Sequence, residues 1–229
     1  GAQELDATAR LMRDLTEAPG PSAFEEAVRE IVVAEYRSLG ADIAFDGLGS
    51  VVATLPGNTS GPRVMVTAHM DEVGLMVQYV TEDGFIRVKN LGGLLDQAYP
   101  DQRWTILGAN GPVPAVSGLP TIHVTPPEQR SRAWSLTEIF LDVGAASRAE
   151  VEALGVRPGD GIAPWTPFLV LPNGRYAAKA WDDRVGLAVM IAAARRIRAE
   201  NLRIPAQILW VATTQEEIGL RGAQTSVDL

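Results

Sequence analysis

The sequence predicts an α/β domain that is interrupted by a β-rich insertion. Helical periodicity and short apolar runs alternate in residues 1–72 and again in residues 167–229. Residues 73–166 instead carry short alternating runs separated by Gly, Pro, Asp and Asn, which is typical of a compact β-rich unit. A hydrophobic content of 46% with 21% charged residues is ordinary for a globular protein of this length. We therefore expect 1–72 and 167–229 to form one body and 73–166 to form an insert.

The N-terminal segment predicts two helices followed by a hairpin. Apolar residues recur at helical spacing on both sides of the Pro-Gly-Pro run at 19–21. Ser22 and Glu25 have the spacing of a capping box, in which the hydroxyl accepts a backbone N–H and the glutamate bonds back to the cap. The second helix is therefore expected to begin there. Two strands follow at 42–45 and 50–55, with Asp-Gly turn chemistry between them.

Two further apolar runs, at 63–68 and 206–213, predict strands that are buried on both faces of a sheet. Between them, apolar residues from 182 to about 199 predict a strong helix. In the insert, strands are expected at 75–80, 85–88, 105–107 and 139–143, with a brief helix at 147–154.

Composition argues against several classes of partner. The formal net charge of −8 disfavours nucleic acid and anionic membrane as the main partner. No run approaches the roughly 18 apolar residues that a membrane span needs. Because no signal peptide is visible, we expect a cytoplasmic protein. The absence of cysteine excludes disulfides, thiolate metal sites and cysteine nucleophiles.

Polar clusters follow or open the predicted elements at three places: His69 and Asp71, Asp182 and Asp183, and Glu216 and Glu217. The first and third clusters follow the two buried strands, and the second opens the helix. Because ligands gather at the carboxyl ends of strands and at the adjoining helix N-termini, we expect all three clusters to face one crevice.

These residue types suit a divalent metal centre. Imidazole and carboxylate are ligands of zinc and cobalt, and carboxylates can bridge two ions. An acidic residue two positions after a ligating histidine can fix the imidazole, and one of two adjacent glutamates can accept a proton from water while the other binds metal. Each cluster alone has a simpler interpretation: a structural histidine, a helix cap or a solvated loop. Their combination favours the metal centre.

Three motifs carry a resemblance to a known family: His-Met-Asp-Glu-Val-Gly at 69–74, Lys-Ala-Trp-Asp-Asp-Arg-Val-Gly at 179–186 and Gln-Glu-Glu-Ile-Gly-Leu-Arg-Gly-Ala at 215–223. They resemble the tetrahedral (TET) aminopeptidases, a family of dinuclear metallopeptidases that includes deblocking and glutamyl aminopeptidases and proteins labelled cellulase M. The resemblance implies an α/β, three-layer metallopeptidase-type catalytic domain with an inserted β-barrel-like domain. It also implies homo-oligomers, with dimers formed through the insert and assemblies that often contain twelve subunits.

The resemblance assigns a role to each matching residue. It implies two divalent ions per subunit in the complete enzyme, zinc or cobalt. His69 would be a terminal ligand of one ion and Glu217 of the other, with Asp182 bridging both and its peptide to the next residue usually cis. Asp71 would orient His69, and Glu216 would be the general base. The predicted function is a metal-dependent aminopeptidase that removes N-terminal residues from peptides with a water activated by the dinuclear centre.

The sequence departs from the family pattern at its C-terminal end. The family needs two further ligands beyond Glu217, an aspartate and a histidine. Asp228 comes too early, and His123 lies in the insert, where we interpret it as structural or as lining an interface. We therefore expect this chain to lack the C-terminal third of the enzyme and to be inactive alone; the interpretation we favour is a fragment, and a naturally truncated relative is the alternative. The missing strands would leave an apolar sheet edge.

Two other functions compete with the aminopeptidase. A non-catalytic scaffold would explain the absent ligands. A glycoside hydrolase would use Glu216 and Glu217 as its carboxylate pair, but neighbours in sequence tend to point apart and that chemistry does not need a histidine–aspartate pair. Lys179 and Arg184 are either solvated charges near the helix start or, as we favour, groups that stabilise the acidic cluster.

Overall fold

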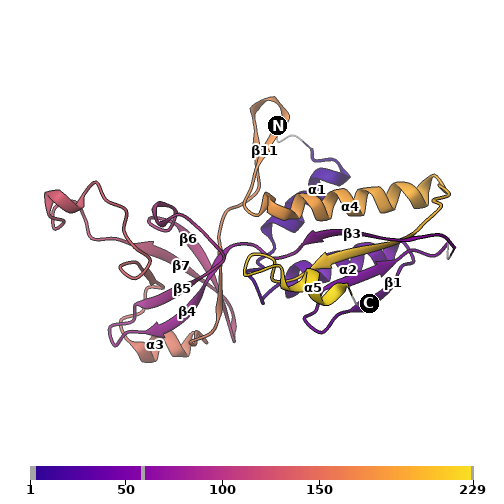
Figure 1. The fold of residues 1–229 in the computed structure, drawn as a ribbon. Helices are drawn as coiled ribbons and strands as arrows, with labels where there is room; N and C mark the ends of the chain where they lie inside the picture. The colour runs from indigo at the N-terminus through magenta and orange to yellow at the C-terminus, as the bar shows by residue number, and fades with distance from the viewer. Residues whose placement is uncertain (1–3, 58–59, 228–229) are drawn as a thin grey trace. The chain divides into compact units, whose positions relative to one another are not determined.

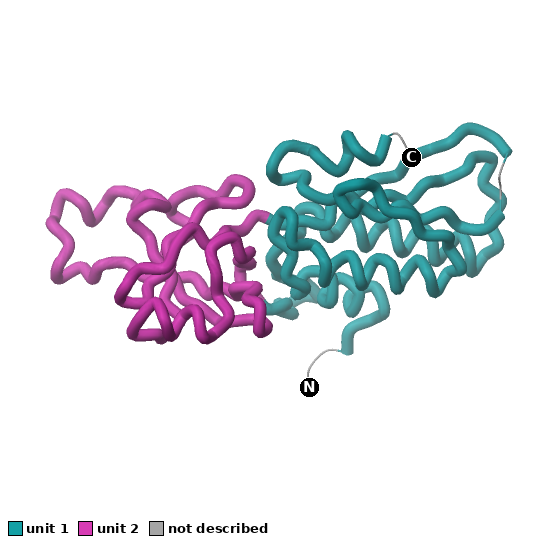
Figure 2. Tube along the Cα trace, turned by 90° about the horizontal axis from the view of Figure 1, so that it is seen from below, with its two compact units in different colours: residues 1–72, 167–229 teal, residues 73–166 magenta. Residues whose placement is uncertain are grey.

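The protein is described by a computed structural model of residues 4–57 and 60–227, in which the chain divides into two compact units (Figures 1 and 2). Unit 1 consists of residues 1–72 and 167–229, and unit 2 of residues 73–166. Within the described ranges, no helix is both long and apolar enough to cross a lipid bilayer.

Unit 1 combines helices with a four-stranded sheet. Its elements are α1 (Ala7–Glu17), α2 (Glu26–Ser38), β1 (Asp42–Phe45), β2 (Val51–Thr54), β3 (Arg63–His69), β10 (Leu169–Leu171), β11 (Arg175–Ala177), α4 (Trp181–Ala199), β12 (Gln207–Thr213) and α5 (Arg221–Ser226). The sheet has the order β1-β2-β12-β3, and β10 and β11 form a separate hairpin. Strand β12 runs parallel to β3 and antiparallel to β2.

The helices α1, α2 and α4 bury their apolar faces in one core against the sheet. This core includes Leu15 of α1, Val32 of α2, Leu187 and Ile191 of α4, and Trp210 of β12, all buried. The opposite face of the sheet carries a smaller cluster, and Figure 1 shows the short α5 in front of the strands with α2 behind them. Apolar residues at helical spacing place one stripe of each helix toward the sheet, which is why the predicted helices form here.

Strand β3 differs from the prediction of a strand buried on both faces. It is an edge strand in the described sheet, and Val64 and Met65 near its start are 42% and 37% exposed. Its end is buried at Ala68 and His69. The prediction was correct for β12, which has a strand on each side and is buried from Leu209 onward. An apolar run in the sequence shows only that a strand is hydrophobic. Whether that strand has a neighbour on both sides is decided by the topology of the sheet.

Unit 2 is a closed six-stranded barrel with the strand order β4-β5-β8-β7-β6-β9. Its elements are β4 (Gly74–Val80), β5 (Ile86–Leu91), β6 (Arg103–Gly108), β7 (Gly111–Gly118), β8 (Phe140–Asp142), α3 (Arg148–Ala153) and β9 (Gly161–Pro164). The α/β fold class with an inserted barrel is thus confirmed. Strand β7 was not predicted, because Pro112 and Pro114 cannot donate to a ladder. Only residues 116–118 of β7 pair with β8. At Pro112 and Pro114, β7 therefore has a partner strand on one side, which is β6.

Candidate metal centre

His69 lies at the end of β3, where its Cα pairs with that of Thr213 at the end of β12. The parallel strands therefore deliver His69 and the Gln215–Glu217 turn to the same edge of the sheet. The imidazole is buried, with Nδ1 3.0 Å from the carbonyl oxygen of Asp71. Its Nε2 lies 3.0 Å from Oδ1 of Asp182 and 3.6 Å from Oε2 of Glu216. The ring thus presents Nε2 to the carboxylates brought by α4 and by the turn after β12.

Asp71 is fully buried and lies behind His69. Its Oδ1 is 3.4 Å from Nδ1 of His69, farther than its own carbonyl oxygen, so the main hydrogen bond to the ring comes from the backbone. The carboxylate accepts instead from the backbone N–H groups of Glu216 and Glu217 and from the hydroxyl of Ser22. Burial alone would raise the pKa of the Asp71 carboxyl, but these bonds and the one to His69 hold it below its ordinary value.

The two aspartates at the start of α4 have different tasks. Their peptide bond is cis, and both have non-helical backbone angles, so the regular helix begins after them. The Asp183 side chain accepts the N–H of Gly186 at 3.1 Å, which is the capping role that an Asp-Asp pair suggests. A Cβ at Gly186 would lie 2.5 Å from that carboxylate, so a side chain there would displace the capping group. Asp182 is left exposed and turned toward His69.

His69, Asp182 and Glu217 each offer a ligand atom, and these atoms all lie within 4.8 Å of one another. Burial lowers the pKa of His69, but Asp71, Asp182 and Glu216 outweigh burial and raise it to about 9. Burial also raises the pKa of Glu217, and the carboxylates of Glu216 and Asp182 add to the increase. The cluster thus favours the protonated, positive form of His69 and disfavours the negative form of Glu217. Both shifts indicate an excess of negative charge that a divalent cation would balance. Imidazole and carboxylate are donors that divalent metal ions accept.

Lys179 and Arg184 contact Glu72 rather than the acidic cluster. Lys179 Nζ donates to Oε1 of Glu72 at 2.5 Å, and the Arg184 guanidinium lies 3.6 Å from the same oxygen. Arg184 also donates to the carbonyls of Leu15, Ala18 and Met70, although its Nη2 has no hydrogen-bond partner among the described residues. Burial lowers the pKa of Lys179 and of Arg184, and Glu72 opposes it. The two cations therefore join β3, α1 and α4 behind the site.

Sequence reasoning missed Glu72, Ser22 and Glu25 as parts of this site. The predicted capping box is wrong: α2 begins at Glu26, and Glu25 makes no side-chain cap bond. Ser22 and Glu25 are buried and bond to Asp71 and to the turn after β12 instead. Their spacing in the sequence matches a capping box, so it carried no signal of this role. His123 is exposed in the insert, and Asp228 lies outside the described residues.

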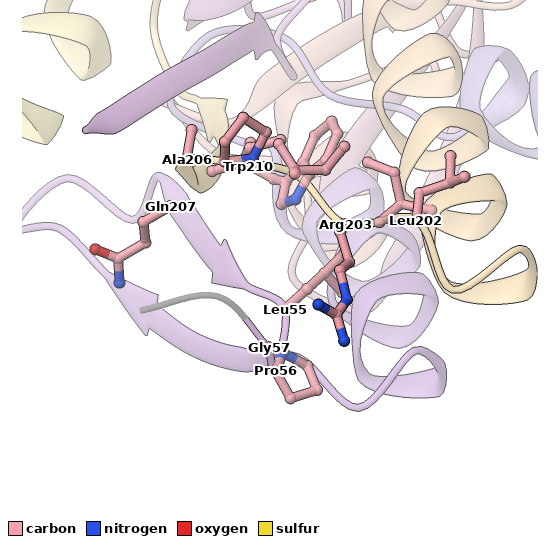
Figure 3. A pocket seen from close by; sticks show the side chains of 12 residues that line it. Leu55, Pro56, Gly57, Leu202, Arg203, Ala206, Gln207 and Trp210 are labelled. Atoms are coloured by element: carbon pink, nitrogen blue, oxygen red, sulfur yellow. The ribbon is translucent and has the colours of Figure 1, made fainter. Parts of the chain in front are cut away.

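A hollow of about 690 Å³ in unit 1 lies at the other end of β12 (Figure 3). It is lined by Leu55, Pro56 and Gly57 after β2, by the connection from α4 to β12, and by the first residues of β12. Its walls are mostly aliphatic, with Arg203 as the charged residue. Because β12 runs from this hollow to the Gln215–Glu217 turn, the hollow is separate from the candidate metal centre.

A protein-family model described as M42 glutamyl aminopeptidase matches residues 49–228, which include all five predicted site residues. The chain belongs to the M42 glutamyl aminopeptidase family. The resemblance seen in the three sequence motifs is thereby confirmed. Among curated relatives, this M42 chain is 38% identical over 226 residues to a lysyl aminopeptidase of Pyrococcus furiosus, covering 94% of the chain and 61% of that protein.

Solved structures agree with the M42 assignment. A TET aminopeptidase from a marine-sediment Thaumarchaeota archaeon superposes with a TM-score of 0.93 at 38% identity, covering 97% of this chain and 63% of that one. The TET1 peptidase of Pyrococcus horikoshii, described as able to assemble into a tetrahedron or a large octahedral shell, has a TM-score of 0.85 at 28% identity, covering 95% and 64%. The chain spans about 60% of the length of the curated relatives it matches.

Proposed function

We propose that this chain is part of a metal-dependent aminopeptidase and carries the front half of its dinuclear centre. The observation that carries the proposal is the convergence of His69, Asp182 and Glu217 within 4.8 Å, with Glu216 beside them. The names of the relatives support the reaction class. The substrates would be peptides with a free N-terminus.

In this proposal His69 and Glu217 would each hold a different ion, and Asp182 would hold both. Zinc and cobalt both fit the donor set. A bound divalent ion supplies Lewis acidity, which lowers the pKa of water and polarises a carbonyl. Two further ligands, an aspartate and a histidine, would come from outside the described residues, as the family pattern requires.

Glu216 is the proposed general base. Its side chain is 33% exposed, so it is open to water and substrate, and its Oε2 lies 3.6 Å from Nε2 of His69. It would accept the proton of the attacking water and pass it to the leaving amine. Asp71 would act on His69 indirectly, because it holds both the ring and the backbone of the turn that carries the two glutamates.

The test of the base is Glu216→Gln in a chain that also carries the remaining ligands. General acid–base catalysis contributes about 10²- to 10⁴-fold, so turnover of a peptide substrate should fall by at least about 100-fold while bound metal is retained. Glu30→Gln on the exposed surface of α2 is the matched control and should keep normal turnover. Near-normal turnover in Glu216→Gln with metal retained would show that Glu216 is not the base.

We also propose that the protein forms homo-oligomers through unit 2, up to the twelve subunits that the family resemblance implies. The assembly described for the TET1 peptidase supports this proposal. Unit 2 exposes large apolar side chains such as Ile122 and Val124, at 61% and 73%. Light scattering after size-exclusion chromatography should give a mass at least twice that of one chain. A monomer at all concentrations would contradict the role of unit 2.

A scaffold without metal is the competing function. It is motivated by the family's need for two ligands in addition to His69, Asp182 and Glu217. It predicts assembly without metal uptake. Elemental analysis after exhaustive dialysis separates the two functions, because tightly bound ions would be incompatible with the scaffold.

A further inference from the structure

The backbone of the Gln215–Glu217 turn is held by carboxylates from outside the turn. Three consecutive N–H groups donate to buried acids: Gln215 to Oε1 of Glu25 at 3.0 Å, Glu216 to Oδ1 of Asp71 at 2.9 Å, and Glu217 to Oδ2 of Asp71 at 3.0 Å. The turn follows a strand, where these N–H groups have left the ladder. Glu25 and Asp71 thus supply acceptors that the sheet no longer provides.

Both acceptors are themselves tied to the connection between α1 and α2. The Ser22 hydroxyl donates to Oδ2 of Asp71 at 2.6 Å, and Glu25 follows three residues later. Ser22 and Glu25 are 0% and 1% exposed, so neither is solvated, and Glu25 makes no side-chain cap bond to α2. A buried carboxylate is unfavourable unless it is hydrogen-bonded. The carboxylates of Glu25 and Asp71 both accept hydrogen bonds from the backbone of the Gln215–Glu217 turn.

The conformation of the turn explains why it needs support. Gln215 has φ = +54° and Ala23 has φ = +74°, a left-handed backbone that residues with a side chain adopt only when their surroundings impose it. One oxygen, Oε1 of Glu25, accepts the N–H of both residues, each at 3.0 Å. Glu25 therefore joins two strained positions, one in the α1–α2 connection and one next to the proposed base.

From this geometry we infer that Ser22 and Glu25 are positioning residues for the metal centre. They hold the Gln215–Glu217 turn through its backbone, so that the carboxylates of Glu216 and Glu217 face His69 and Asp182. The inference rests on the proposed function of this cluster. The Ser22 side chain donates to Asp71, and the Glu25 side chain accepts from the backbone of Ala23 and Gln215, so both residues act through Asp71 and the turn.

The variants separate hydrogen-bond acceptance from packing. Glu25→Met preserves side-chain length but cannot accept the two N–H groups, whereas Glu25→Gln keeps an acceptor oxygen at the same reach. Ser22→Ala removes the bond to Asp71. Glu26→Gln changes an exposed carboxylate next to Glu25 and is the matched control.

Two measurements on the 229-residue chain test the inference. The first is hydrogen exchange of a peptide spanning residues 214–218, with peptides from α4 as internal reference. The second is titration with Co²⁺ alone, followed by its visible absorption spectrum. Residues that orient metal ligands typically contribute 10- to 100-fold in metal affinity. Glu25→Met and Ser22→Ala should each weaken Co²⁺ binding at least tenfold, and Glu25→Met should accelerate exchange at 214–218 at least tenfold while α4 is unchanged.

Glu25→Gln and Glu26→Gln should stay within about threefold of the wild type in both measurements. Unchanged exchange at 214–218 in Glu25→Met would overturn the inference, as would equal losses in the Met and Gln variants. Uniform loss of protection across unit 1 would also overturn it, because Glu25 would then be merely structural. A wild-type chain that takes up no Co²⁺ would refute metal binding by the three ligands of this chain, and the exchange measurement would still decide whether Glu25 holds the turn.

Discussion

Replacing Glu72 by glutamine is expected to cause one of the largest losses of stability that a single substitution in unit 1 can produce. Glu72 is 2% exposed and accepts from Lys179 at 2.5 Å and from the Gly20 N–H at 3.0 Å, with Arg184 3.6 Å away. The side chains of Lys179 and Arg184 are 8% and 0% exposed. Glutamine keeps the shape and can still accept from Gly20, but it removes the largest source of negative charge acting on the two buried cations.

The magnitude follows from the burial of the cations. Removing one partner of a buried ion pair typically destabilises a protein by about 3–5 kcal/mol, because the remaining charge is desolvated without compensation. Total stabilities are of the order of 5–15 kcal/mol, so Glu72→Gln should remove a large part of the stability of unit 1. Burial lowers the pKa of Lys179 and Glu72 opposes that effect, so in the variant Lys179 loses its proton more readily. The penalty should therefore shrink at alkaline pH.

Urea unfolding followed by tryptophan fluorescence measures the effect. The free energy of unfolding of Glu72→Gln at neutral pH should be lower than that of the wild type by about 3 kcal/mol or more. Glu30→Gln, an exposed carboxylate, should change it by less than about 0.5 kcal/mol. A loss below about 1 kcal/mol for Glu72→Gln, or a penalty that grows with pH, would refute the reasoning that two desolvated cations depend on this carboxylate.

Three further predictions concern the metal centre and its support. Burial lowers the pKa of His69, but neighbouring carboxylates raise it to about 9. Without added metal, protonated His69 should therefore stabilise the folded chain by about 3 kcal/mol below pH 6.5, and this stabilisation should be lost as the pH rises through 9. His69→Gln should remove this pH dependence from the free energy of unfolding, measured by unfolding titrations. Co²⁺ at 100 times its Kd should stabilise the chain by about 2.7 kcal/mol, and a melting temperature that still rises with Co²⁺ in His69→Gln would contradict ligation by His69. Gly222→Ala places a Cβ 2.5 Å from the backbone of Thr214, so thermal unfolding should show that the free energy of unfolding falls by about 1–3 kcal/mol or more. Gly47→Ala is the control: its Cβ would have nothing within 4 Å, and the free energy of unfolding should change much less.

The fold was predictable where one local signal dominates. The helices α1, α2 and α4 follow from apolar residues at helical spacing, and β4, β5, β6 and β8 from short alternating runs. Two of the exceptions have a physical cause that the structure shows. Strand β7 could not be predicted because it contains two prolines. They are tolerated because β7 has only one partner strand at these positions. The exposure of β3 depends on its place at the sheet edge, which no property of its own residues records.

The candidate site shows the same division. His69, Asp71, Asp182, Glu216 and Glu217 could be selected because their residue types and their places after strands or before a helix indicate metal chemistry. Ser22 and Glu25 have no such signal, since their spacing matches a capping box that does not form. Lys179 and Arg184 stand beside Asp182 in sequence, yet their contact is Glu72, more than a hundred residues earlier in the chain.

The amino-acid sequence by itself determined the α/β class, the β-rich insert, the family motifs and the candidate residues for binding a divalent ion, whereas the barrel was implied by the family resemblance. These depend on local periodicity and on the chemistry of single side chains. Only the tertiary structure decided that Asp183 caps α4 while Asp182 faces His69, and that Ser22, Glu25 and Asp71 hold the turn that carries the glutamates. The physical reason is that a hydrogen bond or a buried ion pair depends on distance in space, and the chain brings residues 22, 71 and 216 together only when the parallel strands β3 and β12 pair beside the α1–α2 connection.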